Sequence, residues 1–360
     1  MRRVCFITPE FPPIKGGVSD YLYLVCEELL KRGDLAVEVV CTREQPADYT
    51  QNEGVPVRWT SRNNQKLSEY LQHFNGDVIL QYSGYGYQQR NCPVWLLRVL
   101  TKWKAHRSNS RLFTMFHELG GSGPVWSSSF WLAPLQWWIP ISIAKLSDAC
   151  VTNRTAYSSF LSRATGGFVR TNCAISNVGE PPTVPPVAQR KKRLVIFGSK
   201  TWREIAFREH TSAIAHACAM LGLSEIVNVG EANMKIPEQV GNHPVRNTGW
   251  LSPADLSFFL SESVAAFFSY PVDFLGKSSI YAAYCSHGIV PVGDSENVPP
   301  REGLENQKHF LLAGSLSEIT EPSKLQEISD AVRTWYVPHS LAQHADMYEN
   351  LVMNRGVAGS

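Results

Sequence analysis

Short apolar runs alternate along the chain with longer segments in which apolar residues recur every three or four positions. Runs rich in β-branched and aromatic residues predict buried strands, whereas the longer spacing predicts helices with one apolar face. In the first half of the chain the predicted strands are 3–8, 36–41, 77–83, 111–118 and 149–153. Strands that alternate with helices are typical of a parallel sheet, so the first half is predicted to be an α/β domain.

The same alternation begins again after a proline-rich segment, 181–193, which reads PPTVPPVAQRKKR. This segment has no hydrophobic period and ends in basic residues, so we interpret it as a solvated linker. The strands predicted beyond it are 193–199, 225–230, 245–250, 263–270 and 289–293, and the helices are 209–221, 278–286 and one that begins at Ser252-Pro253. The chain is therefore predicted to contain two doubly wound α/β domains. Each has its ligand site at the carboxyl ends of its strands, with a shared site between the domains.

The loop PEFPPIKGG separates the first strand from a helix whose apolar positions are Val18, Tyr21, Leu22, Val25 and Leu29. We expect Ser19 or Asp20 to cap this helix and Gly33 to end it. Gly16 and Gly17 lack side chains just before the helix, where free N–H groups and the helix dipole favour an anion such as a diphosphate. A tight turn with positive φ accounts for the two glycines equally well. The loop has neither the dinucleotide fingerprint nor the Walker pattern.

A second candidate anion site lies in the segment DFLGKSSIYAAYCSHG, 273–288, which leads into a predicted helix. Gly276, Lys277, Ser278 and Ser279 fall at the amino end of that helix, where a lysine, two hydroxyls and free N–H groups suit a diphosphate. The alternative is that Ser278 only caps the helix and Lys277 is solvated. We favour the anion site because Gly, Lys and Ser occur together at this helix end.

Two further strand ends carry candidate chemistry. Lys200, Arg203 and Arg208 follow the strand 193–199, where one or two of them are placed to neutralise a departing phosphate, although any one alone is more typical of a surface. His117 and Glu118 end the strand 111–118 beside a glycine loop. A lone histidine is more often structural than catalytic, but its position at a strand end makes the two interpretations equally good.

The composition limits which partners, metals and membrane segments are expected for this chain. The chain has 360 residues, of which 44% are hydrophobic, and a net charge of only +2, which argues against a nucleic-acid partner. Its eight cysteines are scattered and form no Cys-x-x-Cys pair, so we expect free buried thiols in a reducing cytoplasm. No clustered His, Cys or Asp ligands occur, so a bound metal is not expected. No apolar run is long enough for a membrane span.

Four of the ten tryptophans, namely Trp126, Trp131, Trp137 and Trp138, fall within residues 125–145. Such aromatics suit a peripheral contact with the inner face of a membrane, or a polyprenyl or glycan acceptor. Packing between helices of the first domain is the alternative, and we favour it slightly. The tyrosines of QYSGYGYQQR are candidates for the same acceptor pocket.

The chain resembles the retaining GT-B glycosyltransferases in three stretches that occur in the family's order: PEFPPIKGGVSDYLYLVCEELLKRG, then SDACVTNRT before ISNVGEPP, then GWLSPADLSFFLSESVAAFFSYPVDFLGKSSIYAAYCSHGIVPVG. The resemblance implies an acceptor domain over 1–185 and a nucleotide-sugar donor domain over 190–336. It also implies that a terminal helix, about 337–355, packs back on the first domain. The implied activity is sugar transfer with retention from a nucleotide sugar to a glycan, a lipid-linked or a small-molecule acceptor, with no metal or other cofactor.

Site residues follow from the resemblance position by position. Gly16 and Gly17 match the loop near the donor diphosphate, and His117 matches a histidine near the transferred sugar. Lys200 and Arg208 resemble the basic pair that clamps the diphosphate, with a longer spacing than usual, and Arg203 is the alternative member of this pair.

The family's two glutamates fall at Asp273 and Tyr281. Asp273 keeps a carboxylate for a sugar hydroxyl, whereas a tyrosine cannot accept both hydroxyls of a ribose as a glutamate does. We expect Lys277 to compensate at the phosphates. The alternatives are a degenerate, non-catalytic sugar-binding protein, a sugar-nucleotide epimerase on the same fold, and a phosphorylase, which lacks a convincing cofactor lysine here.

Overall fold

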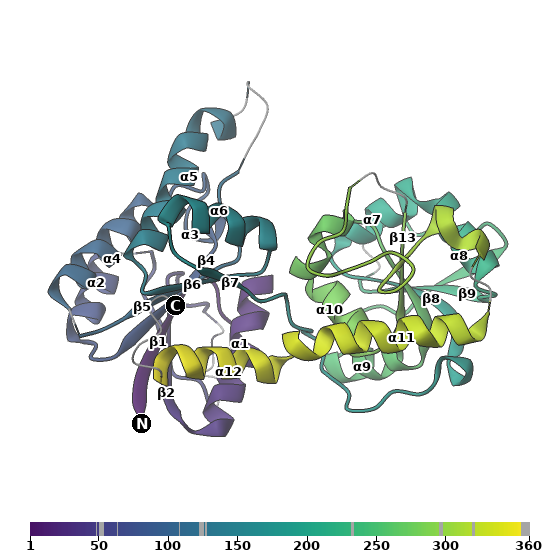
Figure 1. The fold of residues 1–360 in the computed structure, drawn as a ribbon, viewed down its shortest axis with the longest axis horizontal. Helices are drawn as coiled ribbons and strands as arrows, with labels where there is room; N and C mark the ends of the chain where they lie inside the picture. The colour runs from purple at the N-terminus through teal and green to yellow at the C-terminus, as the bar shows by residue number, and fades with distance from the viewer. Residues whose placement is uncertain are drawn as a thin grey trace. The chain divides into compact units, whose positions relative to one another are not determined.

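The computed structural model describes residues 1–47, 49, 54–62, 64–107, 109–121, 126, 128–231, 234–294, 298–318 and 321–353. It divides into two compact units, which are treated separately below. Unit 1 comprises Met1–Asn172 together with Leu341–Ser360, and unit 2 comprises Cys173–Ser340. Each unit is a sheet covered by helices, so the predicted α/β fold class is confirmed (Figure 1).

Unit 1 contains a seven-stranded parallel sheet with the order β3-β2-β1-β4-β5-β6-β7. Its strands are β1 Arg2–Thr8, β2 Leu35–Cys41, β3 Val57–Trp59, β4 Asp77–Tyr82, β5 Leu112–Phe116, β6 Ala149–Thr152 and β7 Val169–Thr171. Its helices are α1 Gly17–Arg32, α2 Asn64–His73, α3 Gly84–Tyr87, α4 Val94–His106, α5 Ser128–Leu146, α6 Thr155–Thr165 and α12 Leu341–Met353. The strand order reverses between β1 and β4, which is where a doubly wound sheet opens a crevice.

Unit 2 contains a second seven-stranded sheet, with the order β10-β11-β9-β8-β12-β13-β14, in which only β10 and β11 pair antiparallel. Its strands are β8 Lys191–Phe197, β9 Glu225–Val229, β10 Gln239–Val240, β11 His243–Asn247, β12 Ser263–Phe268, β13 Val290–Gly293 and β14 Leu311–Leu312. Its α-helices are α7 Lys200–Glu209, α8 Thr211–Met220, α9 Pro253–Ser261, α10 Ser279–Ser286 and α11 Pro322–Tyr336. Its 3-10 helices are η1 Val187–Gln189, η2 Val272–Lys277, η3 Ala313–Glu318 and η4 Val337–His339. The reversal lies between β8 and β12.

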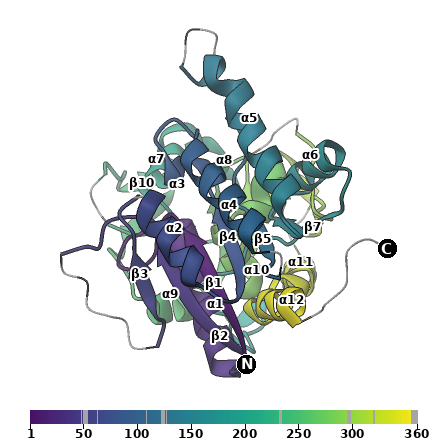
Figure 2. The same ribbon diagram turned by 90° about the vertical axis from the view of Figure 1, so that its left-hand side faces the viewer.

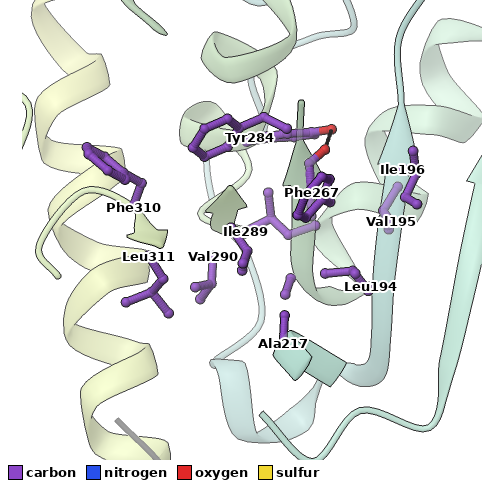
Figure 3. Packing of buried hydrophobic residues seen from close by; sticks show 14 of the residues in the cluster. Leu194, Val195, Ile196, Ala217, Phe267, Tyr284, Ile289, Val290, Phe310 and Leu311 are labelled. Atoms are coloured by element: carbon purple, nitrogen blue, oxygen red, sulfur yellow. Dashed lines mark hydrogen bonds between the residues drawn. The ribbon is translucent and has the colours of Figure 1, made fainter. Parts of the chain in front are cut away.

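The core of unit 2 is built from the apolar strand residues that the sequence pattern singles out. Leu194, Val195 and Ile196 of β8 are buried beside Phe267 of β12 (Figure 3). The buried Tyr284 hydroxyl of α10 donates a hydrogen bond to the Phe267 carbonyl oxygen at 3.1 Å, so the polar tip of this tyrosine is satisfied inside the core.

The first helix ends as predicted but begins differently. Gly33 adopts the left-handed conformation, with φ of 77°, and closes α1. At the other end Gly16 is the N-cap residue, whereas Ser19 lies buried within the helix and Asp20 is in its first turn. The expectation that Ser19 or Asp20 caps the helix is therefore wrong, because α1 starts directly after the glycine pair. At α9, by contrast, the Ser252 hydroxyl accepts from the Asp255 N–H, as the Ser-Pro start predicts.

The proline-rich segment belongs to unit 2 and is not a solvated linker. Arg190 is buried, and its guanidinium donates to the carbonyl oxygens of Pro185 and Gly288 at 2.8 and 2.6 Å. Arg193 is also buried, 3.5 Å above the ring of Phe259. Burial lowers the pKa of Arg190 to about 10 and lowers that of Arg193 as well. The expectation of a solvated basic run holds for Lys191 and Lys192, which are exposed, and is wrong for Arg190 and Arg193. A single sequence does not show that backbone carbonyl groups elsewhere accept from these two guanidinium groups.

The boundary between the units lies at Asn172 and Cys173, before the proline-rich segment where the sequence placed it. The reason is that the chain after Cys173 already bonds to unit 2, since the Ala174 N–H donates to the Gly276 carbonyl oxygen at 2.8 Å. The chain returns to unit 1 at α12, which packs against α1 and β1, and Arg32 of α1 forms ion pairs with Asp346 and Glu349. Residues 354 and 355 of the expected terminal helix lie outside the described residues.

All eight cysteines are buried and free, as expected. Within the described ranges, no group of three His, Cys, Asp or Glu side chains is gathered as a metal site would require. The helices of the described part include none with the length and apolar character to cross a membrane.

Candidate functional site

Unit 1 brings several polar groups to the carboxyl edge of its sheet, where the strand order reverses. The loops after β1 and β4 touch there, since a Cβ atom built on Gly86 would lie 2.7 Å from Cγ of Pro9. The hydroxyl of Tyr87 donates to the carbonyl oxygens of Ile7 and Gln81, which ties the two strands together at this edge. The groups described next therefore share a rigid frame.

The amino end of α1 is occupied by a carboxylate of the chain itself. Glu10 accepts hydrogen bonds from the backbone N–H groups of Val18 and Ser19, and burial raises the pKa of its carboxyl group. A Cβ atom on Gly16 would lie 2.0 Å from Oε1 of Glu10, so only glycine leaves room for this contact. Gly16 has an extended φ of 175°, which means that space and not a positive φ requires the glycine. The first of the two predicted anion sites thus holds an internal anion.

His117 is buried at the end of β5 and belongs to a hydrogen-bonded network. Its Nε2 lies 2.8 Å from Oε1 of Gln81, and Nε2 of Gln81 donates to the hydroxyl of Tyr348 at 3.2 Å. The Tyr348 hydroxyl lies 3.0 Å from that of Tyr21, which in turn lies 2.9 Å from Nδ1 of His344. Because Gln81 accepts, His117 carries a proton on Nε2. Burial raises the pKa of Tyr348 to about 12, so its hydroxyl stays protonated.

Ser83 and Gln81, which were not selected from the sequence as site residues, complete this edge. Ser83, directly after β4, donates to Oε2 of Glu118 at 3.1 Å, which places a half-buried carboxylate beside His117. Gln81 is fully buried within β4. A glutamine inside the apolar run DVILQYS is the one sequence signal for this network, whereas nothing local to residues 341–353 indicates that His344 and Tyr348 join it.

In unit 2 the start of α10 meets the loop after β8. A Cβ atom on Gly198 would lie 2.5 Å from Cδ1 of Ile280, the second residue of α10. Ser278 caps the helix, because its hydroxyl accepts from the Tyr281 N–H at 3.2 Å and donates to the Tyr270 hydroxyl at 2.6 Å. Asp273, Lys277 and Ser279 are partly exposed at this helix end.

Gly276 has a packing role. It is buried, and a Cβ atom there would lie 2.9 Å from Cγ of Glu302 and 3.2 Å from Sγ of Cys173. Its carbonyl oxygen accepts from the Ala174 N–H. Within the predicted Gly-Lys-Ser-Ser group, Gly276 and the Ser278 hydroxyl therefore make structural contacts. Lys277 and Ser279 are partly exposed.

The structure places Tyr281 in the core of unit 2 and corrects its prediction as a donor-binding residue. Its side chain is fully buried, and the hydroxyl donates to the His309 carbonyl oxygen at 2.8 Å. The ring packs edge-on against Phe268 and Trp335. A tyrosine is larger and more apolar than the glutamate expected from the resemblance, and this position turns it inward to fill the space between α10 and α11.

The basic residues after β8 lie on a helix, α7, where the sequence predicted a loop. Trp202 of α7 accepts through its carbonyl oxygen from Ser269, which follows β12, so the start of this helix lies along the carboxyl edge. Lys200 and Arg208 are eight residues apart on α7, or about 12 Å along the axis at 1.5 Å per residue. Arg208 lines a cavity of about 860 Å³ with Phe207 and Lys235. The two cations therefore extend from opposite ends of α7.

Arg203, the alternative to Lys200 and Arg208 as a phosphate-binding cation, is buried and has a structural role. Its guanidinium donates to the carbonyl oxygens of Gly198 and Glu231 and to Oδ1 of Asn228, at 3.1 to 3.3 Å. Burial lowers its pKa. It fixes the loops after β8 and β9 relative to one another.

A histidine and an aspartate that the sequence analysis missed meet at the same edge. Nδ1 of His210, directly after α7, lies 2.8 Å from Oδ2 of Asp294, directly after β13. The side chain of His210 is 19% exposed, so it is accessible from solvent. A carboxylate on Nδ1 leaves Nε2 as the basic nitrogen of the neutral ring. The two residues are 84 positions apart, so no local pattern reveals them.

No protein-family model and no curated protein sequence matches the chain. Solved structures match it over nearly its whole length. Alpha-glucosyltransferase (AGT) in complex with UDP is 9% identical, with a TM-score of 0.60 and coverage of 98% of this chain and 100% of its own. TarM is 8% identical, with a TM-score of 0.65 and coverage of 98% and 99%. The catalytic domain of starch synthase IV from Arabidopsis thaliana, bound to ADP and acarbose, is 11% identical, with a TM-score of 0.60 and the same coverage.

These structures have the GT-B fold, and this chain has it too. The alpha-glucosyltransferase is also similar to the chain in its complex with UDP and a 13-mer DNA containing a HMU base, at 9% identity and a TM-score of 0.59. The fold by itself therefore does not exclude a nucleic acid, and the absence of such a partner stays a prediction from the net charge.

Proposed function

We propose that this chain, which has the GT-B fold over its whole length, is a retaining glycosyltransferase. It moves a sugar from a nucleotide-sugar donor to a glycan, lipid-linked or small-molecule acceptor in the cytoplasm, in polysaccharide or glycoconjugate synthesis. The observation that carries the proposal is the match of 98% of the chain to glycosyltransferase structures solved with UDP or ADP.

Unit 2 is proposed to bind the donor. The start of α10 provides backbone N–H groups and the positive end of a helix dipole, and Lys200 and Lys277 are the cations at that edge. Arg208, at the far end of α7, is proposed to contact another part of the same extended donor, because it lies about 12 Å along the helix axis from Lys200. Asp273 is proposed to accept a hydroxyl of the transferred sugar.

Unit 1 is proposed to present the acceptor. Its carboxyl edge carries a half-buried carboxylate, Glu118, beside His117, whose ring the Gln81 amide holds in one orientation. Glu118 is suited to accept acceptor hydroxyls, and Gln81 acts through His117 as a positioning residue. Gly16 serves this site indirectly, because it admits Glu10 to the start of α1.

The chemistry needs no protein nucleophile and no metal in this proposal. The bond from the sugar's anomeric carbon to the diphosphate oxygen breaks, and a bond to the acceptor oxygen forms on the same face. The acceptor's proton moves to the departing diphosphate. Lys200, Lys277 and the α10 dipole stabilise the negative charge that develops on that leaving group, which is where such groups lower the barrier most.

A thermal-shift screen with UDP-, GDP- and ADP-sugars tests the proposal, followed by mass spectrometry of any stabilising donor after incubation. We expect one nucleotide class to raise the melting temperature and Lys200→Ala to abolish the shift. Lys192→Ala is the matched control, because Lys192 is exposed near the opposite, amino end of β8. The absence of a shift with every donor contradicts the proposal. Binding without turnover favours the degenerate protein, and a changed sugar still linked to its nucleotide favours the epimerase.

A further inference from the structure

Helix α5 carries aromatic side chains on its outer face and a polar side chain on its inner face. Gln136 is 1% exposed, whereas Trp131 is 74% exposed. A helix on the surface of a protein in water normally shows the opposite arrangement, with apolar residues inside and polar residues outside. The outward side of α5 is therefore suited to surroundings other than water.

The exposed aromatic residues of this region form one surface, called here the α5 aromatic face. Its members are Phe130, Trp131 and Trp138. Trp126, which is 84% exposed, precedes the helix. Phe130 and Trp138 are eight residues apart with the exposed Pro134 midway, so they follow one side of the helix. Figures 1 and 2 both show the amino-terminal part of α5 extending away from the sheet of unit 1.

The inner side of α5 is fixed to the rest of unit 1, so the face cannot simply rotate inward. Oε1 of Gln136 accepts from the Gly121 N–H at 3.1 Å, and Nε2 donates to the Arg90 carbonyl oxygen at 3.0 Å. The ring of Trp137 packs on Phe160 of α6 at a centroid distance of 4.7 Å. Turning the aromatic face toward the core would break these contacts and leave a buried amide unsatisfied.

The charge pattern indicates what covers this face. No ionisable side chain occurs from Leu119 to Ala144, so contact with lipid would bury no charge there. Lys145 lies in the last turn of α5, and Arg90 contacts α5 through its carbonyl oxygen. Both side chains are exposed, and a cation beside an apolar surface complements anionic lipid headgroups. Tryptophan, with an apolar ring and one polar N–H, is enriched where hydrocarbon meets headgroups.

We propose that the α5 aromatic face docks unit 1 onto the interface of an anionic lipid bilayer. The helix lies on the bilayer and does not cross it. The loop after β5 runs from His117 to Gly121, which is bonded to α5, so docking brings the proposed acceptor site close to the lipid surface. That the acceptor is itself lipid-linked rests on the proposed function, whereas the docking does not.

Flotation with vesicles tests the docking without any assay of transfer. The wild-type chain is expected to float with vesicles of equal parts phosphatidylglycerol and phosphatidylcholine, and more weakly with phosphatidylcholine alone. The Trp131→Ala/Trp138→Ala variant is expected to bind at least about tenfold more weakly. Trp250→Ala is the matched control, since Trp250 is 68% exposed but belongs to unit 2. Arg90→Ala is expected to weaken binding to the anionic vesicles only.

Two results would overturn the docking proposal. One is a wild-type chain that stays in the soluble fraction with both vesicle types, and the other is a double variant that floats as well as wild type. Sedimentation analysis without lipid adds a third outcome: self-association that the double variant abolishes, with no vesicle binding, assigns the face to a second copy of the chain. Because the substituted tryptophans are exposed, the fold is expected to survive, which circular dichroism checks. A donor-induced thermal shift without flotation would refute the docking and leave the proposed function intact.

Discussion

The network around His117 gives a prediction that the structure allows us to work out in magnitude. Tyr348→Phe removes one hydroxyl from a site in which the tyrosine is 1% exposed. The ring is retained, with its edge-on contact to Phe6 at 5.4 Å, so packing changes little. The hydroxyl of Tyr21 keeps His344 as a partner at 2.9 Å. What is lost is the acceptor for Nε2 of Gln81, which is fully buried.

A buried donor left without an acceptor costs about 1–3 kcal/mol, so we expect Tyr348→Phe to destabilise unit 1 by about 2 kcal/mol. For a unit of this size each kcal/mol shifts the melting temperature by about 2–4 °C, which gives a decrease of about 4–8 °C. The same free energy corresponds to an increase of up to about 30-fold in the population of the open state.

Calorimetry measures the shift, and hydrogen exchange assigns it. Because a two-unit chain need not unfold in one step, the exchange rates of peptides from β4 and α12 identify the unit that is affected. We expect faster exchange in both elements and no change in unit 2. Tyr23→Phe is the control, since the hydroxyl of Tyr23 donates to Glu27 on the surface of α1. A Tyr348→Phe shift no larger than that of the control would refute the reasoning, and faster exchange in α12 alone would show that Gln81 does not depend on this hydroxyl.

Three other predictions address unit 2. Burial lowers the pKa of His287 to about 4, whereas an unfolded histidine titrates near 6.5. As the pH falls from about 6.5 to about 4, the unfolded chain takes up the proton before the folded one, so unit 2 should lose stability over this range. His287→Gln should flatten this part of a melting-temperature profile, and an unchanged profile contradicts it. Lys200→Ala should lower kcat/KM by about 10- to 100-fold, whereas Arg208→Ala should raise KM with little change in kcat, since it is proposed to bind a remote part of the donor. Equal effects on kcat argue against the separation of the two cations. Tyr281→Phe should lower the stability of unit 2 by about 1 kcal/mol, because it leaves the His309 carbonyl oxygen unpaired. Calorimetric titration should show no change in donor affinity. A weaker affinity would indicate that Tyr281 does contribute to donor binding.

The sequence predicts the sheets well because buried parallel strands are nearly continuous apolar runs. The strands expected at 77–83 and 263–270 differ from β4 and β12 by no more than two residues at either end. The short edge strands β3, β7, β10 and β14 were not predicted, since two or three residues carry too little periodicity. Helix α7 was predicted as a loop, because its apolar residues are few and polar ones dominate.

The site was harder to predict, because side chains from distant segments create it. Gly16 was selected from the sequence as part of an anion site, but the carboxylate that fills this position comes from Glu10, and the sequence does not show that Glu10 folds back. His117 was a candidate from its strand end alone, while Tyr348, which joins it through Gln81, lies 267 residues from Gln81 along the chain. The burial of Arg190 and Arg193 was not predicted for the same reason, since a buried guanidinium group needs carbonyl oxygens from other segments as acceptors.

The return of α12 to unit 1 has a consequence for how the chain acquires its structure. Unit 2 is one continuous stretch, so a ribosome completes it before Leu341 emerges. Unit 1 then still lacks His344 and Tyr348, so the hydroxyl of Tyr21 and Nε2 of Gln81 have not yet formed their hydrogen bonds to α12. Domains generally fold as units during synthesis, yet here the first domain to begin is the last to finish. A stop codon at Leu341 would therefore damage the amino-terminal half of the molecule, while unit 2 would still be complete.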